Sequence, residues 1–457
     1  MKFIKTWFVI FVSGFAALQA QAGVTFTSLI SFNQTNGATP EAGLSPGSDG
    51  NFYGTTSTGG TNDDGTIFQL TSSGVFTSMI SFDGTNGAEP RAGLIQGADG
   101  NFYGTTYNGG SNNFGTLFRL TTHGALTTLV TLSFSGGGYP IAGLIQDQNG
   151  NFYGTASIGG ANSGGTVYEW ATNGTLATLA AFDINGSGGN SPYAGLAQGA
   201  DGNFYGTTFQ GGSKNYGTIF QLTTNSLLTA LVSFNNTNGA NPYAKLVRGL
   251  DGNFYGTTYF GGSNGYGTIF KFATNGALTT LVSFDNTNGA NPQGGLIQDS
   301  EGNFYGTTSA GGAYTNQLGI GYGTVFKLAT NGTFSTLISF DGTNGASPEA
   351  GLIQGADGNF YGTTANGGTN GYGTIFRFSV AAPSPPKFLK IESMDGAVTL
   401  TWSATVGQDY QMLYKTNLTQ AAWNNLNTTV TATNATMTTF DAAGSGPQRF
   451  YRILALP

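Results

Sequence analysis

A phrase of eight residues is repeated seven times along the chain, and no other feature of the sequence constrains the fold as strongly. Its first complete copy is DGNFYGTT at residues 49–56. The other copies centre on the Phe-Tyr pairs at 102/103, 152/153, 204/205, 254/255, 304/305 and 360/361. From Asn51 to Asn359 the copies are spaced by 50, 50, 52, 50, 50 and 56 residues. This period is typical of the blades of a β-propeller.

Each repeat unit predicts four short strands, which in the fifth unit cover residues 243–247, 253–258, 267–272 and 278–284. The Asp-Gly or Asn-Gly pair before the second strand predicts a type I′ hairpin turn. The glycine after each Phe-Tyr pair is expected where neighbouring sheets approach closely. In the third strand, Ile269 lies on one face and Phe270 and Phe272 on the other, which favours a sheet packed between two others.

The two ends of the repeat array predict a closed ring. The last unit stops after its third strand, residues 373–378, and its missing fourth strand resembles residues 26–32 at the start of the array. An N-terminal strand that completes the last blade removes a free sheet edge. The expected fold is therefore an all-β, seven-bladed propeller over residues 23–380, closed by its N-terminal strand.

The repeat resembles the GloVer-type (Gloeo/Verruco) tandem repeat of secreted bacterial proteins. The resemblance rests on seven copies of D-G-N-F-Y-G-T-T…G-G…G-T-I-F, with small variations, across residues 24–379. It implies export and a propeller-like array. It brings no catalytic residues, because the family is defined by its repeat and not by a reaction.

The segments outside the array predict a leader, a linker and a second domain. Residues 1–22 combine a basic start, an apolar run and an Ala20-Gln21-Ala22 cleavage site, as a signal peptide does. Residues 381–386 are a proline-rich linker. Residues 387–457 resemble a small fibronectin type III-like β-sandwich, with Trp402 expected in its core. The mature chain is therefore predicted to be secreted or held at the cell surface, with cleavage near Ala22.

Composition excludes several classes of function. The chain has no cysteine, so thiol catalysis, disulfides and cysteine-ligated zinc are excluded. Only 8% of its residues are charged, its pI is about 4.6, and loss of Lys2 and Lys5 would move the net charge from −7 to −9. Nucleic acid is therefore not an expected partner. No membrane-spanning segment is expected in the mature chain, and a monomer is expected.

Few residues are candidates for chemistry. The single histidine, His123, occupies a predicted turn, so no Ser-His-Asp triad or multi-histidine metal site can form. The repeated hairpin aspartates are explained by turn geometry. Asp63, Asp64 and Glu169 occur once each and are weak candidates for a catalytic acid pair. The four-to-one loops join the fourth strand of one unit to the first strand of the next, and they begin with Asp or Asn. A calcium site at these loops is an open alternative. No catalytic residue, metal ligand or cofactor is predicted.

The variable loops indicate a binding face. The insertion at 185–190 lies in a four-to-one loop, and the insertion at 313–322 lies in a two-to-three loop, which joins the second and third strands of a unit. In a four-stranded meander both loop types lie on one face. Aromatic residues flank the Gly-Gly of the two-to-three loops, and rings with Asn, Ser and Gly neighbours suit sugar or protein recognition. The predicted binding residues are Tyr107, Phe114, Phe209, Tyr216, Tyr259, Phe260, Tyr266, Tyr322 and Tyr372.

Three hypotheses follow from this pattern. The first is an exported, non-catalytic propeller that binds a glycan or an extracellular protein. The second is a carbohydrate-active hydrolase or lyase that uses paired carboxylates. The third is a structural component of the cell surface or matrix. For the five aromatic residues after the Gly-Gly, packing between blades is an equally good explanation.

Overall fold

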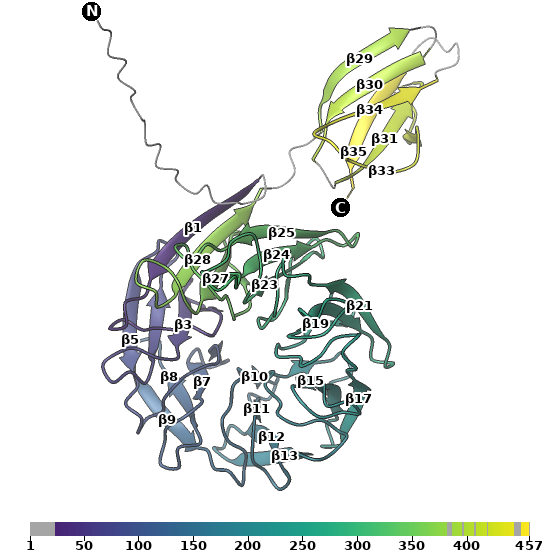
Figure 1. Ribbon diagram of the computed structural model, residues 1–457. Helices are drawn as coiled ribbons and strands as arrows, with labels where there is room; N and C mark the ends of the chain where they lie inside the picture. The colour runs from purple at the N-terminus through teal and green to yellow at the C-terminus, as the bar shows by residue number, and fades with distance from the viewer. Residues whose placement is uncertain are drawn as a thin grey trace, which may run out of the picture.

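The repeat array folds into a ring of seven four-stranded antiparallel sheets around a central axis (Figure 1). The computed structural model of the protein describes residues 23–381, 386–394, 397–405, 408–417, 419–442 and 449–456. Every regular element in these residues is a β-strand. The predicted leader, residues 1–22, lies outside the described residues.

Each of the first six blades uses four consecutive strands. Blade one comprises β2 (Ser45–Pro46), β3 (Phe52–Thr56), β4 (Thr66–Leu70) and β5 (Phe76–Ser81). Blade two comprises β6 (Ile95–Gln96), β7 (Phe102–Thr106), β8 (Thr116–Leu120) and β9 (Leu126–Thr131). Blade three comprises β10 (Ile145–Gln146), β11 (Phe152–Ala156), β12 (Ser163–Trp170) and β13 (Leu176–Asp183).

The next three blades repeat this arrangement. Blade four comprises β14 (Ala197–Gln198), β15 (Phe204–Thr208), β16 (Thr218–Leu222) and β17 (Leu228–Ser233). Blade five comprises β18 (Val247–Arg248), β19 (Phe254–Thr258), β20 (Thr268–Phe272) and β21 (Leu278–Ser283). Blade six comprises β22 (Ile297–Gln298), β23 (Phe304–Thr308), β24 (Thr324–Leu328) and β25 (Phe334–Ser339).

Blade seven is completed by the N-terminal strand, as predicted. It comprises β26 (Ile353–Gln354), β27 (Phe360–Thr364), β28 (Thr374–Val380) and β1 (Val24–Ser31). β1 pairs with β28 along its length, from Val24 opposite Val380 to Ser31 opposite Thr374. The predicted seven-bladed ring with a permuted last blade is confirmed.

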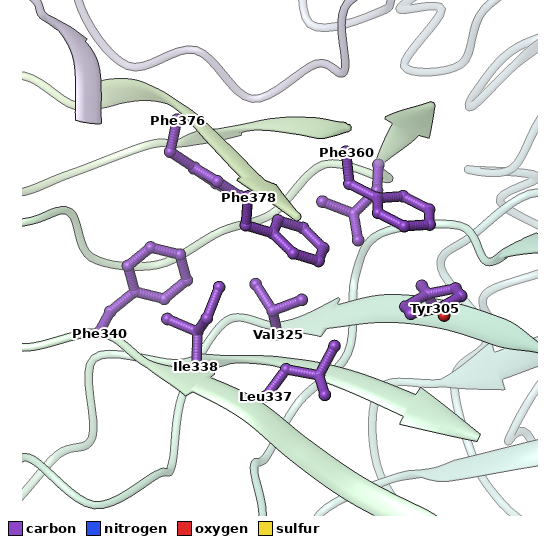
Figure 2. Packing of buried hydrophobic residues seen from close by; sticks show 9 residues of the cluster. Tyr305, Val325, Leu337, Ile338, Phe340, Phe360, Phe376 and Phe378 are labelled. Carbon is purple, nitrogen blue, oxygen red and sulfur yellow. The ribbon is translucent and has the colours of Figure 1, made fainter. Parts of the chain in front are cut away.

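The core is divided into seven hydrophobic clusters, and each cluster joins two consecutive blades. Figure 2 shows the cluster between blades six and seven, where Val325 and Ile338 face Phe376 and Phe378. Both faces of the third strand are buried, as expected for a sheet packed between two others. The stability of the ring therefore depends on contacts between blades as much as on contacts within them.

The Phe-Tyr pair of each second strand forms a closed circle of aromatic contacts. Neighbouring residues of a strand point to opposite faces, so each tyrosine packs on the phenylalanine of the following blade. The seven ring-centroid distances lie between 4.0 Å and 4.7 Å. The last of these contacts joins Tyr361 to Phe52, which closes the circle between blades seven and one.

The innermost strand is shorter than the sequence predicts. Residues 243–247 were expected as the first strand of blade five, but β18 covers only Val247–Arg248. The preceding residues Tyr243, Ala244 and Lys245 line the axial channel instead, as residues of the corresponding segment do in every blade. Their alternating polarity resembles that of a strand, but the backbone bends at Ala244.

Two details of the hairpin differ from expectation. Gly50 has a φ of 80°, whereas Asp49 does not have positive φ. The turn is therefore not type I′ but a three-residue loop that ends in a left-handed glycine. The glycine after the Phe-Tyr pair makes room within its own blade, since a Cβ at Gly54 would lie 2.4 Å from the ring of Phe68.

The C-terminal part contains two small sheets around one core. One sheet has the order β29 (Phe388–Met394), β30 (Ala397–Ser403), β34 (Thr436–Asp441). The other joins β31 (Asp409–Lys415) to β32 (Asn424–Asn425), β33 (Val430–Thr431) and β35 (Phe450–Ala455). Leu400, Trp402 and Met412 are buried together in this core, so the expected core position of Trp402 is confirmed. Its likeness to fibronectin type III domains stays a prediction.

Candidate binding site at the axial mouth

The two variable loop types meet on one face of the propeller, as the sequence predicts. In each blade an antiparallel bridge joins the four-to-one loop to the two-to-three loop. The bridges are Ala38–Thr58, Ala88–Asn108, Gly138–Ile158, Asn190–Gln210, Ala240–Phe260, Ala290–Ala310 and Ala346–Asn366. This face surrounds the opening of the axial channel, which has a volume of 440 Å³. A cavity of this size is in the range of small-molecule sites.

A segment before the first strand reads Pro-x-Ala-Gly-Leu in five blades, Pro-Tyr-Ala-Lys-Leu in blade five and Pro-Gln-Gly-Gly-Leu in blade six. In every blade the residue after its proline lines this opening. We call these seven residues the mouth ring: Glu41, Arg91, Ile141, Tyr193, Tyr243, Gln293 and Glu349. They are chemically diverse, although the residues around them are nearly identical from blade to blade. The two tyrosines come from blades four and five, and the three charged residues come from blades seven, one and two.

The residue before the same proline is held in the left-handed conformation in every blade. Its φ lies between 51° and 56°, and it is never glycine: Thr39, Glu89, Tyr139, Ser191, Asn241, Asn291 and Ser347. This conformation costs about 1 kcal/mol or more for a residue with a side chain. The chain carries that cost in each of the seven blades.

Arg91 is the centre of a polar cluster on the charged side. Its Nη2 donates to Glu89 Oε2 at 2.8 Å, and its Nε lies 3.7 Å from Glu41 Oε2. The guanidinium carbon lies 4.2 Å from the centroid of the Tyr107 ring. Asn108 Nδ2 and Ser57 Oγ donate to the two glutamates at 2.8 Å and 3.1 Å. Arg91 is therefore fixed in place by charge and by ring contact.

Glu349 differs from Glu41 and Glu89 in the environment of its carboxylate. Burial, with a smaller contribution from Glu41, raises the pKa of Glu349 to about 7, and Arg91 opposes the shift. No hydrogen bond or ion pair from the described residues engages its carboxylate. Burial also raises the pKa of Glu41, and Arg91 counteracts that shift. Near neutral pH the mouth therefore presents a protonated fraction of Glu349 beside the Arg91 cluster.

The opposite side of the mouth is aromatic. The ring of Tyr193 stacks on Phe209 at 4.8 Å and meets the edge of Tyr243 at 5.5 Å. Phe209 and Tyr243 are also in contact, at 6.0 Å. Burial raises the pKa of the Tyr243 phenol, and the charges of Glu41 and Glu349 add to the shift. The aromatic wall and the acids therefore act on one another across the opening.

Comparison with known proteins identifies the repeat. The family model of the Gloeobacter/Verrucomicrobia repeat matches residues 16–198 and 183–320. The chain belongs to this family. The resemblance is therefore confirmed. No curated protein matches the chain in sequence.

Solved structures similar to this member of the family are other propellers. The BP39L lectin from Burkholderia pseudomallei is 10% identical, with a TM-score of 0.50 over 75% of this chain and 99% of the lectin. Puromycin hydrolase is 12% identical, with a TM-score of 0.50 over 82% of this chain and 60% of the hydrolase. A putative 6-phosphogluconolactonase from Bacteroides uniformis is 13% identical, with a TM-score of 0.47 over 87% and 99%. At these identities the likeness shows the fold alone.

Of the nine predicted binding residues, three lie beside the mouth ring. Tyr107 contacts Arg91, Phe209 contacts Tyr193, and Tyr259 is influenced by the charge of Glu349. Phe260, Tyr266 and Tyr372 are more exposed, at 45%, 39% and 39% of their surface. Phe114, Tyr216 and Tyr322 are half-buried and contact neighbouring side chains, Phe114 against Tyr139 and the other two against core clusters.

The acids that occur once in the sequence are not brought together. Asp63 Oδ1 accepts from Gly59 N at 2.8 Å and holds a two-to-three loop, where Asp64 follows it. Glu169 lies near the hairpin on the other face and accepts from Asn151 Nδ2 at 2.9 Å. The Tyr153 hydroxyl lies 3.0 Å from Glu169 Oε1 and 3.1 Å from Oδ2 of Asp147, which also accepts from the amides of this hairpin. These residues therefore support no catalytic pair.

The four-to-one loops show why Asp and Asn alternate there. Asp83 Oδ1 accepts from Thr85 Oγ1 and Asn86 N, and Asn33 Oδ1 accepts from Thr35 and Asn36 in the same way. Either side chain can make this turn, since only an acceptor oxygen is needed. Within the described ranges, no group of three or more histidines or acids could hold a metal ion. Nor does any described segment form a helix long and apolar enough to cross a bilayer.

Sequence reasoning missed the mouth ring, although a signal for it is present. The position after the proline holds Glu, Arg, Ile, Tyr, Tyr, Gln and Glu in the seven units, while its neighbours are nearly constant. This variability is the signal, but it lies in a segment that resembles a strand and not in a loop.

Proposed function

We propose that the mature chain is an exported carbohydrate-binding protein that takes its ligand at the axial mouth and does not catalyse a reaction. The observation that carries this proposal is the polarity of the mouth ring. Tyr193 and Tyr243 form one side, and Glu41, Arg91 and Glu349 come from the blades opposite.

This arrangement suits the chemistry of a sugar. An aromatic ring can pack against the apolar face of a pyranose, while carboxylates accept hydrogen bonds from hydroxyl groups and a guanidinium donates them. Arg91 is already held by Glu41 and Glu89, so little side-chain entropy remains to be lost when a ligand binds. A preorganised site of this kind supports recognition more directly than the exposed outer loops do.

The test compares the mouth with the outer loops. The mature chain, residues 23–457, is screened on a glycan array, and the best ligand is measured by isothermal titration calorimetry. Tyr193→Ala with Tyr243→Ala should weaken binding by about tenfold or more. Tyr266→Ala with Tyr372→Ala removes two exposed aromatic residues from the same face and should leave affinity unchanged.

Each outcome has a clear meaning. A loss confined to the outer pair would place recognition on the loops and refute the mouth as the site. Binding of an extracellular protein and of no glycan would refute the carbohydrate proposal. If the intact chain binds neither, a structural role becomes the better explanation.

A second candidate function is hydrolysis or elimination on a carbohydrate. It is favoured by Glu349, whose raised pKa suits a general acid near neutral pH, and by Glu41 in the adjacent blade. Release of reducing ends from an array-selected glycan, lost in Glu349→Gln, would favour this function. Binding without turnover would favour the first.

A further inference from the structure

Just below the mouth, one blade has a different residue at a position that is glycine in the other six. Two residues after the mouth ring, six blades have glycine: Gly43, Gly93, Gly143, Gly195, Gly295 and Gly351. These glycines approach the backbone of the preceding blade, since a Cβ at Gly43 would lie only 2.8 Å from the carbonyl oxygen of Gly351. In blade five the residue at this position is Lys245, and it lines the channel.

Lys245 is a cation without a partner in the described structure. No hydrogen bond or ion pair from the described residues reaches its ammonium group. Its side chain runs past Gly195, where Lys245 Cδ lies 3.8 Å from the position of a Cβ. Its side chain is exposed to solvent, and the surrounding protein lowers the pKa of its ammonium group. Arg91, by contrast, has two carboxylates.

The fold does not require a lysine at this position, because glycine occupies it in the six other blades. Blade five therefore presents to the channel a positive charge that the repeat does not need. An anionic group that entered the channel would supply the missing partner.

We infer that the channel receives the anionic substituent of an acidic saccharide, a carboxylate or a sulfate ester, which pairs with the Lys245 ammonium. This inference rests on the proposed function of the mouth and adds the ligand's chemical class. Tyr243 is two residues away on the same blade, so a sugar stacked on the aromatic wall would have its acidic group directed toward Lys245. The acids at the mouth lie on the side of blades seven, one and two, which favours this orientation of an anion.

The experiment uses the mature chain and three probes in calorimetry: trigalacturonate, its carboxyl-reduced neutral counterpart, and a sulfated heparin disaccharide. Lys245→Met keeps the length of the side chain and removes the charge. Lys271→Met is the matched control, because Lys271 belongs to the same blade and pairs with Asp251 at the surface. We expect one acidic probe to bind at least about tenfold more weakly to Lys245→Met and equally to Lys271→Met. The stronger of the two acidic probes identifies carboxylate or sulfate.

Two further variants keep the test decisive. Lys245→Gly restores the residue of the other blades and should fold and lose the acidic probe as Lys245→Met does. If acidic and neutral probes bind alike and neither responds to Lys245→Met, the inference is wrong. If the double variant Tyr193→Ala with Tyr243→Ala still abolishes that binding, the inference about Lys245 fails but the proposed function of the mouth is retained. If neither acidic probe binds the intact chain, the inference is also refuted.

Discussion

Tyr168 carries a buried hydroxyl group that the equivalent residues of the other blades lack. The third strand of the other blades has phenylalanine at this position, for example Phe118 in blade two. Tyr168 is fully buried, and its hydroxyl has no hydrogen-bond partner in the described structure. Burying a polar group without a partner costs free energy that a phenyl ring does not.

We therefore predict that Tyr168→Phe stabilises the protein by about 1 kcal/mol. The ring keeps its packing over Gly154 and loses only the unsatisfied oxygen. The matched variant Phe118→Tyr should destabilise the protein by a similar amount, because it introduces the same defect in blade two. Urea unfolding of both variants measures the difference. Equal stability of Tyr168→Phe and the unmodified chain would mean that the hydroxyl is satisfied, for example by a bound water.

Glu349 predicts a dependence of stability on pH. Its native pKa of about 7 lies above the ordinary value of 4.5, so between these values the native state binds more protons than the unfolded state. Stability should therefore fall as pH rises through this range, and above pH 7 the cost reaches up to about 3 kcal/mol.

Replacing Glu349 with glutamine should remove that cost. Glu349→Gln is expected to raise the melting temperature at about pH 8 and to change it little at about pH 4. Glu301→Gln, at an exposed hairpin position, serves as the control and should show no such difference. Thermal melts of the three proteins at both pH values decide the matter. A shift of equal size at both values would argue against ionisation of Glu349 as the cause.

At the scale of elements, β1 is the strand that closes the ring, and its deletion tests that role. Without it, β28 becomes an unpaired edge, and the apolar side chains of Ile375 and Phe376 lose part of their cover. Phe26 is also lost from its contact with Phe376 at 5.6 Å. We predict that deletion of residues 23–33 costs several kcal/mol of a total near about 5–15 kcal/mol.

The expected result is a large fall in melting temperature, with aggregation through the exposed edge. Differential scanning calorimetry and light scattering measure the two effects. A truncated protein that melts like the full chain would show that β1 contributes little to closure.

The strands were predictable from the sequence where each carries its own pattern. Residues 26–32 share the pattern of the fourth strands elsewhere, so their place in blade seven could be inferred before any contact was known. The segment from Tyr243 to Leu246 cannot be distinguished from a strand by its sequence, because its polarity alternates, whereas its backbone bends at Ala244. Lys245 belongs to this segment.

The site was predictable only in part. The face that carries it follows from loop lengths, and Tyr107, Phe209 and Tyr259 do lie near its centre. Glu41, Arg91 and Glu349 are 50 to 308 residues apart in the chain, and only closure of the ring brings them to one opening. No local pattern in one unit could show that they meet.

At the scale of the whole molecule, the propeller and the C-terminal unit have separate cores. The buried residues around Leu400, Trp402 and Met412 belong to a cluster that shares no residue with the seven clusters of the ring. Domains with separate cores unfold independently when few contacts join them.

We therefore predict that a chain ending at Ala381 retains the melting transition of the propeller nearly unchanged. Calorimetry of the full mature chain should show a second, smaller transition that the shortened chain lacks. A fall of many degrees in the main transition would show instead that the C-terminal unit supports the ring.

The pairing of β1 with β28 also determines how the propeller would respond to tension. Ala381 N donates to Gly23 O at 2.7 Å, so the chain enters and leaves the ring side by side. A force between attachments at the two ends would therefore act on this single ladder first. Because the strands are antiparallel and are held at the same end, their hydrogen bonds would break one pair at a time, starting at Val24 and Val380. The other six blades would carry no load until this ladder had opened.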